Sequence, residues 1–259
     1  NLPSNFLVNG FNAGRGFGGP RDISSVERVE VLKGPRAALF GRGEPGGTVN
    51  LVSKRPSFEQ TGLARLAVGR FDLLRGEFDW QTTLGESAGL RLVGHHEEGD
   101  SFRDTVETQT TGFTPSLALR LGERTRVVYE LEHSEQEIPF DRGVVAVNGQ
   151  LGLIPASRFL GEPGDGPMRA DVLGHQLELQ HDLADDWSLL VGMTHRDTSL
   201  EGFSTEPELA ASRQQLFVDG RTLTRQRRFR DYDAVYEVLR GELSGRFDTG
   251  SVEHRVLIG

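Results

Sequence analysis

The chain has 259 residues, a formal net charge of −9 and no cysteine. Without cysteine it can form neither disulfide bonds nor thiolate metal sites, and its acidic balance argues against nucleic acid as a partner, since phosphate binding needs clustered Lys and Arg. No apolar run reaches the roughly 18 residues of a membrane-spanning helix, and no signal peptide is visible. Because the first residues, NLPSNFLVNGF, begin without a Met, we expect a piece of a longer protein.

Residues 1–56 are rich in Gly and Pro. They contain three short stretches of strand character, NFLVNGF, VERVEVL and TVNLVSK, and we expect a helical turn at 36–40. In VERVEVLK neither face is purely apolar, because Glu27 and Lys33 share a face with two valines. Such mixed faces suit a strand in polar surroundings. The glycines between the second and third stretches permit positive φ, and the prolines interrupt strand pairing.

Residues 57–259 have a different pattern, in which apolar and polar residues alternate. In 74–84, for example, Phe78 and Trp80 fall on one face while Glu77 and Asp79 fall on the other. The pattern predicts nine strands: 62–71, 74–84, 89–98, 113–121, 126–135, 174–183, 187–197, 232–247 and 253–259.

The connections between these strands also alternate. Short polar turns, GESAG, GERT, ADD and DTGS, alternate with the long linkers 99–112, 136–173 and 198–231. Tight turns at one end and long loops at the other are typical of an outer-membrane β-barrel. The strands of a soluble sandwich or a repetitive lectin would also alternate apolar and polar residues, but the alternation of short turns with long linkers favours the barrel. Nine strands cannot close such a barrel, so we expect further strands beyond residues 253–259 and a chain that is incomplete at both ends.

The stretch VERVEVLKGPRAALFGRGEPGGTVNLVSKRP, residues 26–56, resembles the C-terminal half of the plug domain of TonB-dependent outer-membrane receptors, above all the siderophore receptors. The resemblance is carried by a Glu-Arg-Val-Glu strand that leads to Gly-Pro, by a Leu-Phe-Gly triplet and by a Gly-rich segment that ends in Lys-Arg-Pro. The plug-motif residues that we single out are Glu27, Arg28, Lys33, Gly34, Pro35, Gly41, Gly46, Gly47, Asn50 and Lys54.

The resemblance implies an all-β fold: a transmembrane antiparallel β-barrel of about 22 strands, of which about nine are present, preceded by part of an α+β plug domain. We place the plug part at 1–56 and the barrel part at 57–259. It also implies a location in the outer membrane of a Gram-negative bacterium, in contact with its lipid, and active import of a ferric siderophore driven by the TonB complex. The N-terminal TonB box is not in the sequence. No enzyme activity, cofactor or resident metal is expected.

In this family the ligand binds between the outward loops of the plug and the inner barrel wall. We therefore expect the segment FNAGRGFGGP to be such a loop and Arg15 and Phe17 to contact the ligand, since a guanidinium and an aromatic ring suit a bulky, often anionic chelate. Lys33, Arg42 and Lys54 are candidates for ion pairs between plug and wall, with a solvated charge in the lumen as the alternative.

Within 136–173, PFDRG and FLGEP resemble a loop of the hydroxamate-type receptors. We expect Phe140, Asp141, Arg142, Phe159 and Glu162 to brace this loop. His95 and His96 are adjacent on a strand, so they point to opposite faces and do not predict a metal site. Three alternatives stay open: a receptor for cobalamin, haem or an oligosaccharide; a passive porin or outer-membrane enzyme; and a soluble β-rich binding protein.

Overall fold

A computed structural model describes residues 6–13, 21–34, 47–147, 149–210, 219 and 221–259. The described residues form two sheets, one small and one large. Two short 3₁₀ turns, η1 (Ile23–Ser25) and η2 (Pro163–Asp165), are the helical elements among them. None of the described helices has the length and apolar character needed to cross a membrane.

The small sheet has four strands in the order β2-β1-β4-β3, and we call it the inner sheet. Its strands are β1 (Phe6–Val8), β2 (Phe11–Asn12), β3 (Val26–Lys33) and β4 (Gly47–Ser53). β1 runs parallel to β4, and the other two pairings are antiparallel. The turn from β1 to β2 is Asn9-Gly10, with φ of 52° and 84°. Both values are positive, as the tightest hairpin turns require.

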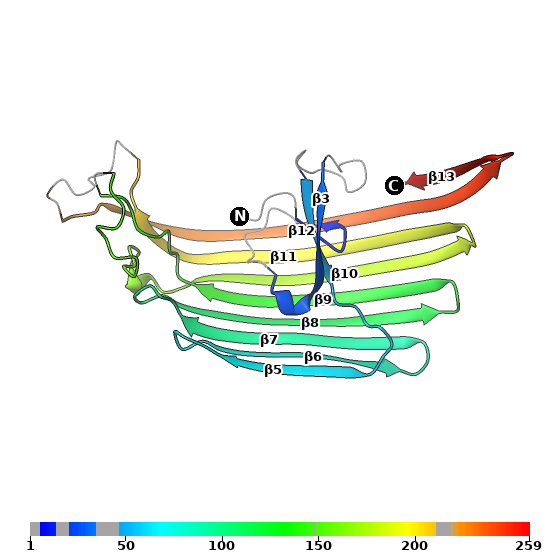
Figure 1. The fold of residues 1–259 in the computed structure, drawn as a ribbon, viewed down its shortest axis with the longest axis horizontal. Coiled ribbons are helices and arrows are strands. Elements are labelled where there is room, and N and C mark those ends of the chain that lie inside the picture. The colour runs from blue at the N-terminus through cyan, green and yellow to red at the C-terminus, as the bar shows by residue number, and fades with distance from the viewer. Residues whose placement is uncertain (1–5, 14–20, 35–46, 148, 211–218, 220) are drawn as a thin grey trace.

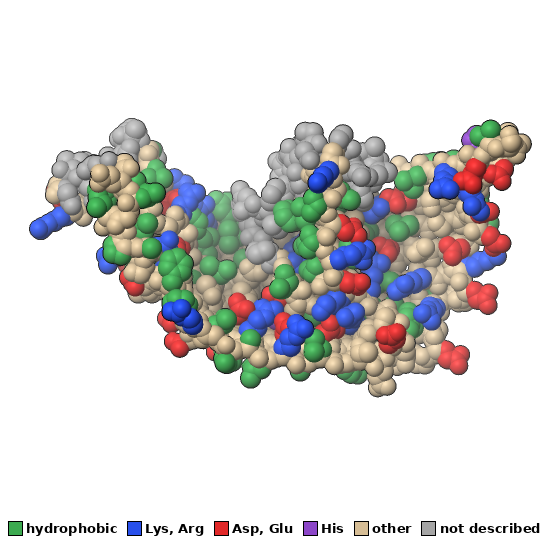
Figure 2. Space-filling view, viewed as in Figure 1, with side chains coloured by type: hydrophobic (Ala, Val, Ile, Leu, Met, Phe, Trp, Pro, Cys, Tyr) green, Lys and Arg blue, Asp and Glu red, His purple; other side chains and the backbone are tan. Residues whose placement is uncertain are grey.

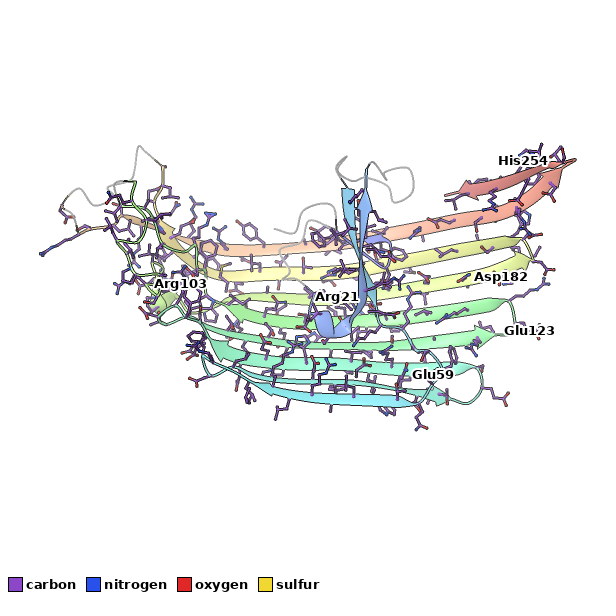
Figure 3. The ribbon with its side chains drawn as sticks, viewed as in Figure 1. Arg21, Glu59, Arg103, Glu123, Asp182 and His254 are labelled. Atoms are coloured by element: carbon purple, nitrogen blue, oxygen red, sulfur yellow. The ribbon has the colours of Figure 1, made fainter. Side chains whose placement is uncertain are left out.

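The large sheet, which we call the wall, has nine antiparallel strands in chain order. They are β5 (Thr61–Val68), β6 (Leu74–Leu84), β7 (Ala88–Asp100), β8 (Glu107–Leu121), β9 (Thr125–Ile138), β10 (Met168–Ala184), β11 (Trp187–Pro207), β12 (Arg225–Thr249) and β13 (Val252–Ile258). Figure 1 shows the wall as a curved sheet with the inner sheet standing in its hollow. Figure 3 labels Arg103 at the end of the wall with the long connections, and Glu123 and Asp182 at the end with the short turns.

All nine predicted wall strands are present, and the long and short connections fall at opposite ends as expected. Several strands are longer than predicted. β10 begins at Met168 rather than 174, and β12 begins at Arg225 rather than 232. At the start of β10 the alternation continues through Met168, Ala170 and Val172, and the prediction missed it. At the start of β12 the apolar alternation fades, but backbone hydrogen bonds continue the ladder whatever the side chains are. Half of the predicted linker 198–231, namely 198–207 and 225–231, is therefore strand, which corrects the prediction.

The two faces of the wall differ as the alternation predicted. In β6, Phe78 and Trp80 are 43% and 41% exposed on the outer face, while Asp79 on the other face pairs with Lys54, the residue that follows the inner sheet. Figure 2 shows charged side chains of both signs on the wall beside the inner sheet. The expected turn at 36–40 lies outside the described residues, so the helical part of the plug prediction is untested. The boundary between residues 56 and 57 also stays a prediction.

Candidate functional site: the contact between inner sheet and wall

The deepest contact between the two sheets is an ion pair. Arg21, just before η1, lies 2.6 Å from Glu130 of β9, and the two side chains are only 4% and 6% exposed. Ser53 at the end of β4 donates a hydrogen bond to the other oxygen of the same carboxylate. Burial alone would lower the pKa of Arg21, but the carboxylates of Glu132 and Glu130 outweigh it and raise that pKa. The guanidinium therefore stays charged inside the contact.

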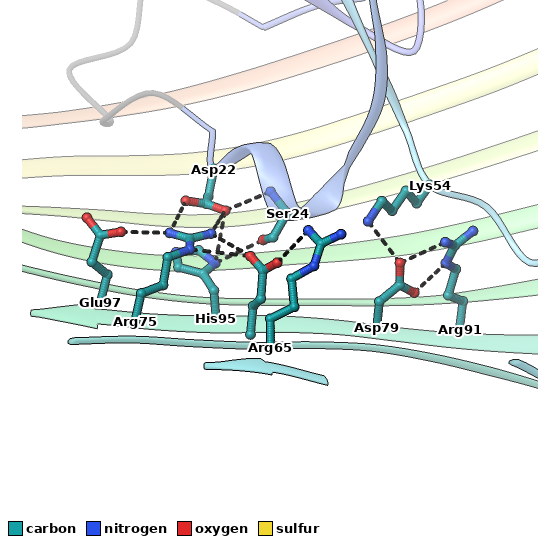
Figure 4. Close-up of polar contacts among 10 residues, drawn as sticks. Asp22, Ser24, Lys54, Arg65, Arg75, Asp79, Arg91, His95 and Glu97 are labelled. Carbon is teal, nitrogen blue, oxygen red and sulfur yellow. Dashed lines mark hydrogen bonds and ion pairs between the residues drawn. The ribbon is translucent and has the colours of Figure 1, made fainter. Parts of the chain in front are cut away.

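A second group of polar contacts surrounds Asp22, the residue that caps η1 (Figure 4). Its carboxylate accepts hydrogen bonds from Arg75 of β6, at 2.8 and 3.1 Å, and from the backbone of Ser24. Arg75 also pairs with Glu77 and Glu97 on the wall. Burial would raise the pKa of Asp22, yet the hydrogen bonds from Arg75 and Ser24 lower it to about 2. Asp22 is thus an anion at any physiological pH.

A third group lies where the chain leaves the inner sheet for the wall. Lys54 is 2.8 Å from Asp79, which also binds Arg91 through both of its oxygens (Figure 4). Next to it, Arg55 donates two hydrogen bonds to Glu178 of β10. Burial alone would lower the pKa of Arg55, but Glu178 outweighs burial and raises it. Ion pairs therefore join inner sheet and wall at both η1 and the chain exit.

The β1–β2 turn makes the apolar part of the contact. Phe11 is 2% exposed, and its ring fills the space where a side chain at Gly192 of β11 would lie, since a Cβ there would be 2.3 Å from the ring. Beside it, Asn9 donates a hydrogen bond to Gln176 and Arg240 donates one to the backbone oxygen of Gly10. Gly192 thus gives the wall a notch that matches one aromatic ring.

This notch yields a prediction. Gly192→Leu is expected to displace Phe11 and destabilise the contact by about 1–3 kcal/mol, the usual cost of overpacking a filled site. Gly241→Leu on β12 is the matched control, because a Cβ there meets nothing within 4 Å. Hydrogen exchange of the inner-sheet amides in the full-length protein measures the effect. Equal exchange in the two variants would contradict the prediction.

The plug-motif residues and the other residues predicted for this region have different surroundings. Asn50 is buried, accepts a hydrogen bond from the Gly10 amide and donates one to Glu30. Gly34 and Gly47 have φ of 85° and 145°, a region that favours glycine. Glu27, Arg28 and Lys33 are exposed on β3. Arg15, Phe17, Pro35, Gly41, Arg42 and Gly46 lie outside the described residues.

Of the three cations considered for ion pairs with the wall, Lys54 makes one, with Asp79. Lys33 is exposed and has no ion pair with a described residue. Sequence reasoning missed the strongest pairs, those of Arg21, Asp22 and Arg55. The available signal was the row of charges at inward positions of the wall strands, such as Arg75 and Glu178, but it does not say which partner each charge meets.

His95 and His96 point to opposite faces of β7, as expected. His95 is buried beside η1, 3.3 Å from Ser24 and 3.6 Å from Asp22. His96 is half-exposed and contacts Thr111 of β8. Among the described residues, no three or more His, Cys, Asp or Glu side chains are grouped so as to hold a metal ion.

The long connections enclose a hollow of about 760 Å³ above the wall. Its lining combines Arg158, Arg221 and Arg225 with the carboxylates of Asp104 and Glu162 and with apolar side chains. Arg225 pairs with Glu162 at 2.9 Å. A volume of roughly 300–1,000 Å³ is typical of small-molecule sites. This end of the wall therefore offers space and charged groups of both signs, with the cations in slight excess.

Comparison with known proteins agrees with this architecture. Residues 3–48 match the TonB-dependent Receptor Plug Domain family. The chain is 37% identical over 250 residues to the metal-pseudopaline receptor CntO of Pseudomonas aeruginosa UCBPP-PA14, which covers 96% of this chain and 34% of that protein. It is 27% identical to the ferrioxamine receptor of Yersinia enterocolitica, over 90% of this chain and 32% of the relative.

Among solved structures, the ferric-catecholate import receptor Fiu of Escherichia coli K12 superposes with a TM-score of 0.87 at 24% identity, covering 98% of this chain and 38% of that one. The chain thus spans about a third of the length of the relatives it matches. Its fold is that of an outer-membrane β-barrel with a plug inside. The plug-domain match and this fold place the chain among the TonB-dependent receptors. The inner sheet is part of its plug.

Proposed function

We propose that the full-length protein imports a ferric siderophore across the outer membrane by transport coupled to the TonB complex. The observation that carries this proposal is the combination of a plug sheet, joined to the wall by ion pairs, with relatives named for metal-pseudopaline, ferrioxamine and catecholate siderophores. The relatives do not single out the hydroxamate branch that the loop motifs suggested. The ligand, the coupling to TonB and the absence of a resident cofactor are all part of the proposal.

Two features support a ligand of this kind. The hollow among the long connections carries the guanidinium groups of Arg158 and Arg221 beside the Arg225–Glu162 ion pair, and guanidinium groups suit the negative charge of many iron chelates. The polar pairing of plug and wall suits a plug that has to shift during transport, because ion pairs can exchange partners with water while a dry apolar core cannot. A receptor for cobalamin, haem or an oligosaccharide is the alternative, and the named relatives do not favour it.

The test is uptake of iron by a deletion strain that carries the full-length gene or an empty vector, in iron-limited medium. A panel of ⁵⁵Fe-loaded siderophores is supplied, with labelled cobalamin in parallel. We expect uptake of at least one siderophore to depend on the gene and to stop when the proton-motive force is collapsed. Gene-dependent uptake of cobalamin alone would overturn the proposal.

The sequence-based ligand contacts give a residue-level prediction. Arg15→Ala and Phe17→Ala are each expected to weaken siderophore binding roughly tenfold, as loss of a charged or aromatic contact usually does, with normal insertion into the membrane. Arg124→Ala is the matched control, because Arg124 is exposed in a short turn at the other end of the wall and pairs only with Asp185 among the described residues. Binding that is unchanged in both variants would remove this segment from the ligand site.

A further inference from the structure

The connection 139–167 between β9 and β10 is fastened to the rim of the next two strands by a buried carboxylate near its end. Asp165 of η2 lies 2.7 Å from Arg227 of β12 and accepts a hydrogen bond from Thr205 of β11 at 2.5 Å. Its side chain is 4% exposed. The guanidinium of Arg227 also lies 3.7 Å from the centre of the Phe203 ring. This carboxylate is therefore held by two adjacent strands at once.

A second buried carboxylate fastens the start of the same connection. Glu206 of β11 is 5% exposed and lies 2.9 Å from Arg142 and 3.9 Å from Arg230. Arg142 and Arg230 both lie over the ring of Phe140, at 5.8 and 5.0 Å. The two ends of the connection thus reach the same short stretch of rim.

The two attachments lie on opposite faces of that rim. Thr205 and Glu206 are successive residues of a strand, and successive side chains of a strand point to opposite faces. Glu206 and Ser204 are even-numbered positions of β11 like Gly192, which faces Phe11 of the inner sheet, whereas Thr205 shares the other face with Arg227, its partner across the ladder. The connection therefore starts on the inner side of the rim and returns on the outer side.

The backbone of the returning chain touches the rim as well. Gly202 of β11 has φ of +142°, and a Cβ there would be 2.9 Å from the Cα of Met168 and 3.2 Å from the carbonyl oxygen of Pro167. A neighbouring connection joins the assembly, because Arg103 pairs with Asp141 at 2.5 Å and the Asp104 amide donates to the carbonyl oxygen of Ser157. The contacts of the connection 139–167 therefore extend from the β7–β8 connection to β12.

We propose that the connection 139–167 grips the rim of β11 and β12 from both faces and forms a fixed part of the receptor mouth, with Asp165 and Glu206 as its positioning residues. Lifting the connection would break the Asp165–Arg227 and Arg142–Glu206 ion pairs and the hydrogen bond from Thr205 at the same time, which is unfavourable. Other loops have to provide whatever movement admits a ligand. The inference goes beyond the proposed function and holds for any ligand.

The test measures the position of the connection in the full-length receptor in detergent. Spin labels are attached to Leu153→Cys, exposed in the connection, and Glu123→Cys, exposed in a short turn. The 259 residues contain no other cysteine. Double electron–electron resonance measures the distance between the two labels, and in the unaltered receptor we expect one narrow peak. In the variants Asp165→Ala and Glu206→Ala we expect a broad distance distribution in place of that peak. Glu201→Gln is the control: Glu201 lies in β11 like Glu206 but does not hold the connection, so the narrow peak should remain.

A charge exchange distinguishes loss of the Asp165–Arg227 ion pair from general misfolding of the variant. Asp165→Arg combined with Arg227→Asp is expected to restore the narrow peak that each single change abolishes, since the pair is re-formed with its polarity reversed. A broad distribution in the unaltered receptor, a narrow one in both Ala variants, or no recovery in the exchanged pair would each overturn the proposal.

Discussion

Replacing Glu130 by Leu is expected to loosen the plug from the wall by about 3–5 kcal/mol, the usual cost of leaving a buried charge without its partner. Arg21 would then be a guanidinium of 4% exposure next to an apolar side chain. The Ser53 hydroxyl would lose its acceptor at the same time. In the full-length protein, amides of β1 and β4 should exchange faster with deuterium, while those at the centre of the wall should keep their protection.

Two further variants make this result specific. Arg21→Met combined with Glu130→Leu removes both charges, and is expected to recover much of the lost stability because no charge is left buried alone. Glu135→Leu on the same strand is the matched control, since its side chain is 60% exposed on the opposite face. If the double variant is as unstable as the sum of the two single changes, the Arg21–Glu130 pair is not what holds η1 to the wall.

Arg75→Leu is expected to have the second large effect, about 3 kcal/mol at neutral pH, by the same reasoning about broken buried ion pairs. Arg75 is the shared partner of Asp22, Glu77 and Glu97. Without it, three carboxylates face one another across the contact between η1 and the wall. Release of η1 can be followed through the fluorescence of a probe on Ile23→Cys, a position that is 79% exposed.

The pH dependence of this variant has a definite sign. In the unaltered protein the pKa of Asp22 is lowered from 3.8 to about 2. Its stabilising contribution is therefore complete above about pH 4 and lost as the pH falls through 2. In Arg75→Leu the repulsion among the carboxylates weakens as they take up protons, so the stability difference from the unaltered protein should shrink between pH 7 and about pH 4. A constant difference over that range would contradict this account.

The architecture of the wall could be predicted from the sequence because one constraint dominates it, the difference in polarity between its two surroundings. Lipid on one side and a polar interior on the other impose an alternation of period two, which Phe78, Asp79 and Trp80 display in three consecutive residues. Strand ends were predicted less well. At the start of β12 both faces are polar, since Arg225–Arg228 reads Arg-Gln-Arg-Arg, so this part of the strand leaves no periodic signal. At the start of β10 Met168, Ala170 and Val172 do alternate with Arg169 and Asp171, and the prediction missed that signal.

The candidate site could be predicted only in part. Lys54 was recognised as a cation at the plug boundary, but its partner Asp79 is 25 residues away and was visible only as one of many inward charges. Arg21 and Glu130 are 109 residues apart, on elements whose relative placement no local pattern encodes. The notch at Gly192 carried no signal at all, because a glycine within a strand is informative only when the ring that fills its space is known.

The two sheets are held together by different kinds of interaction from those within each sheet. Neighbouring wall strands share continuous ladders of backbone hydrogen bonds, as β11 and β12 do from Trp187 to Pro207, whereas plug and wall meet through side chains at a few points. The molecule therefore contains two units of unequal cooperativity. Rising denaturant should melt the plug first and the wall later, so a single melting temperature is not a well-defined property of this protein.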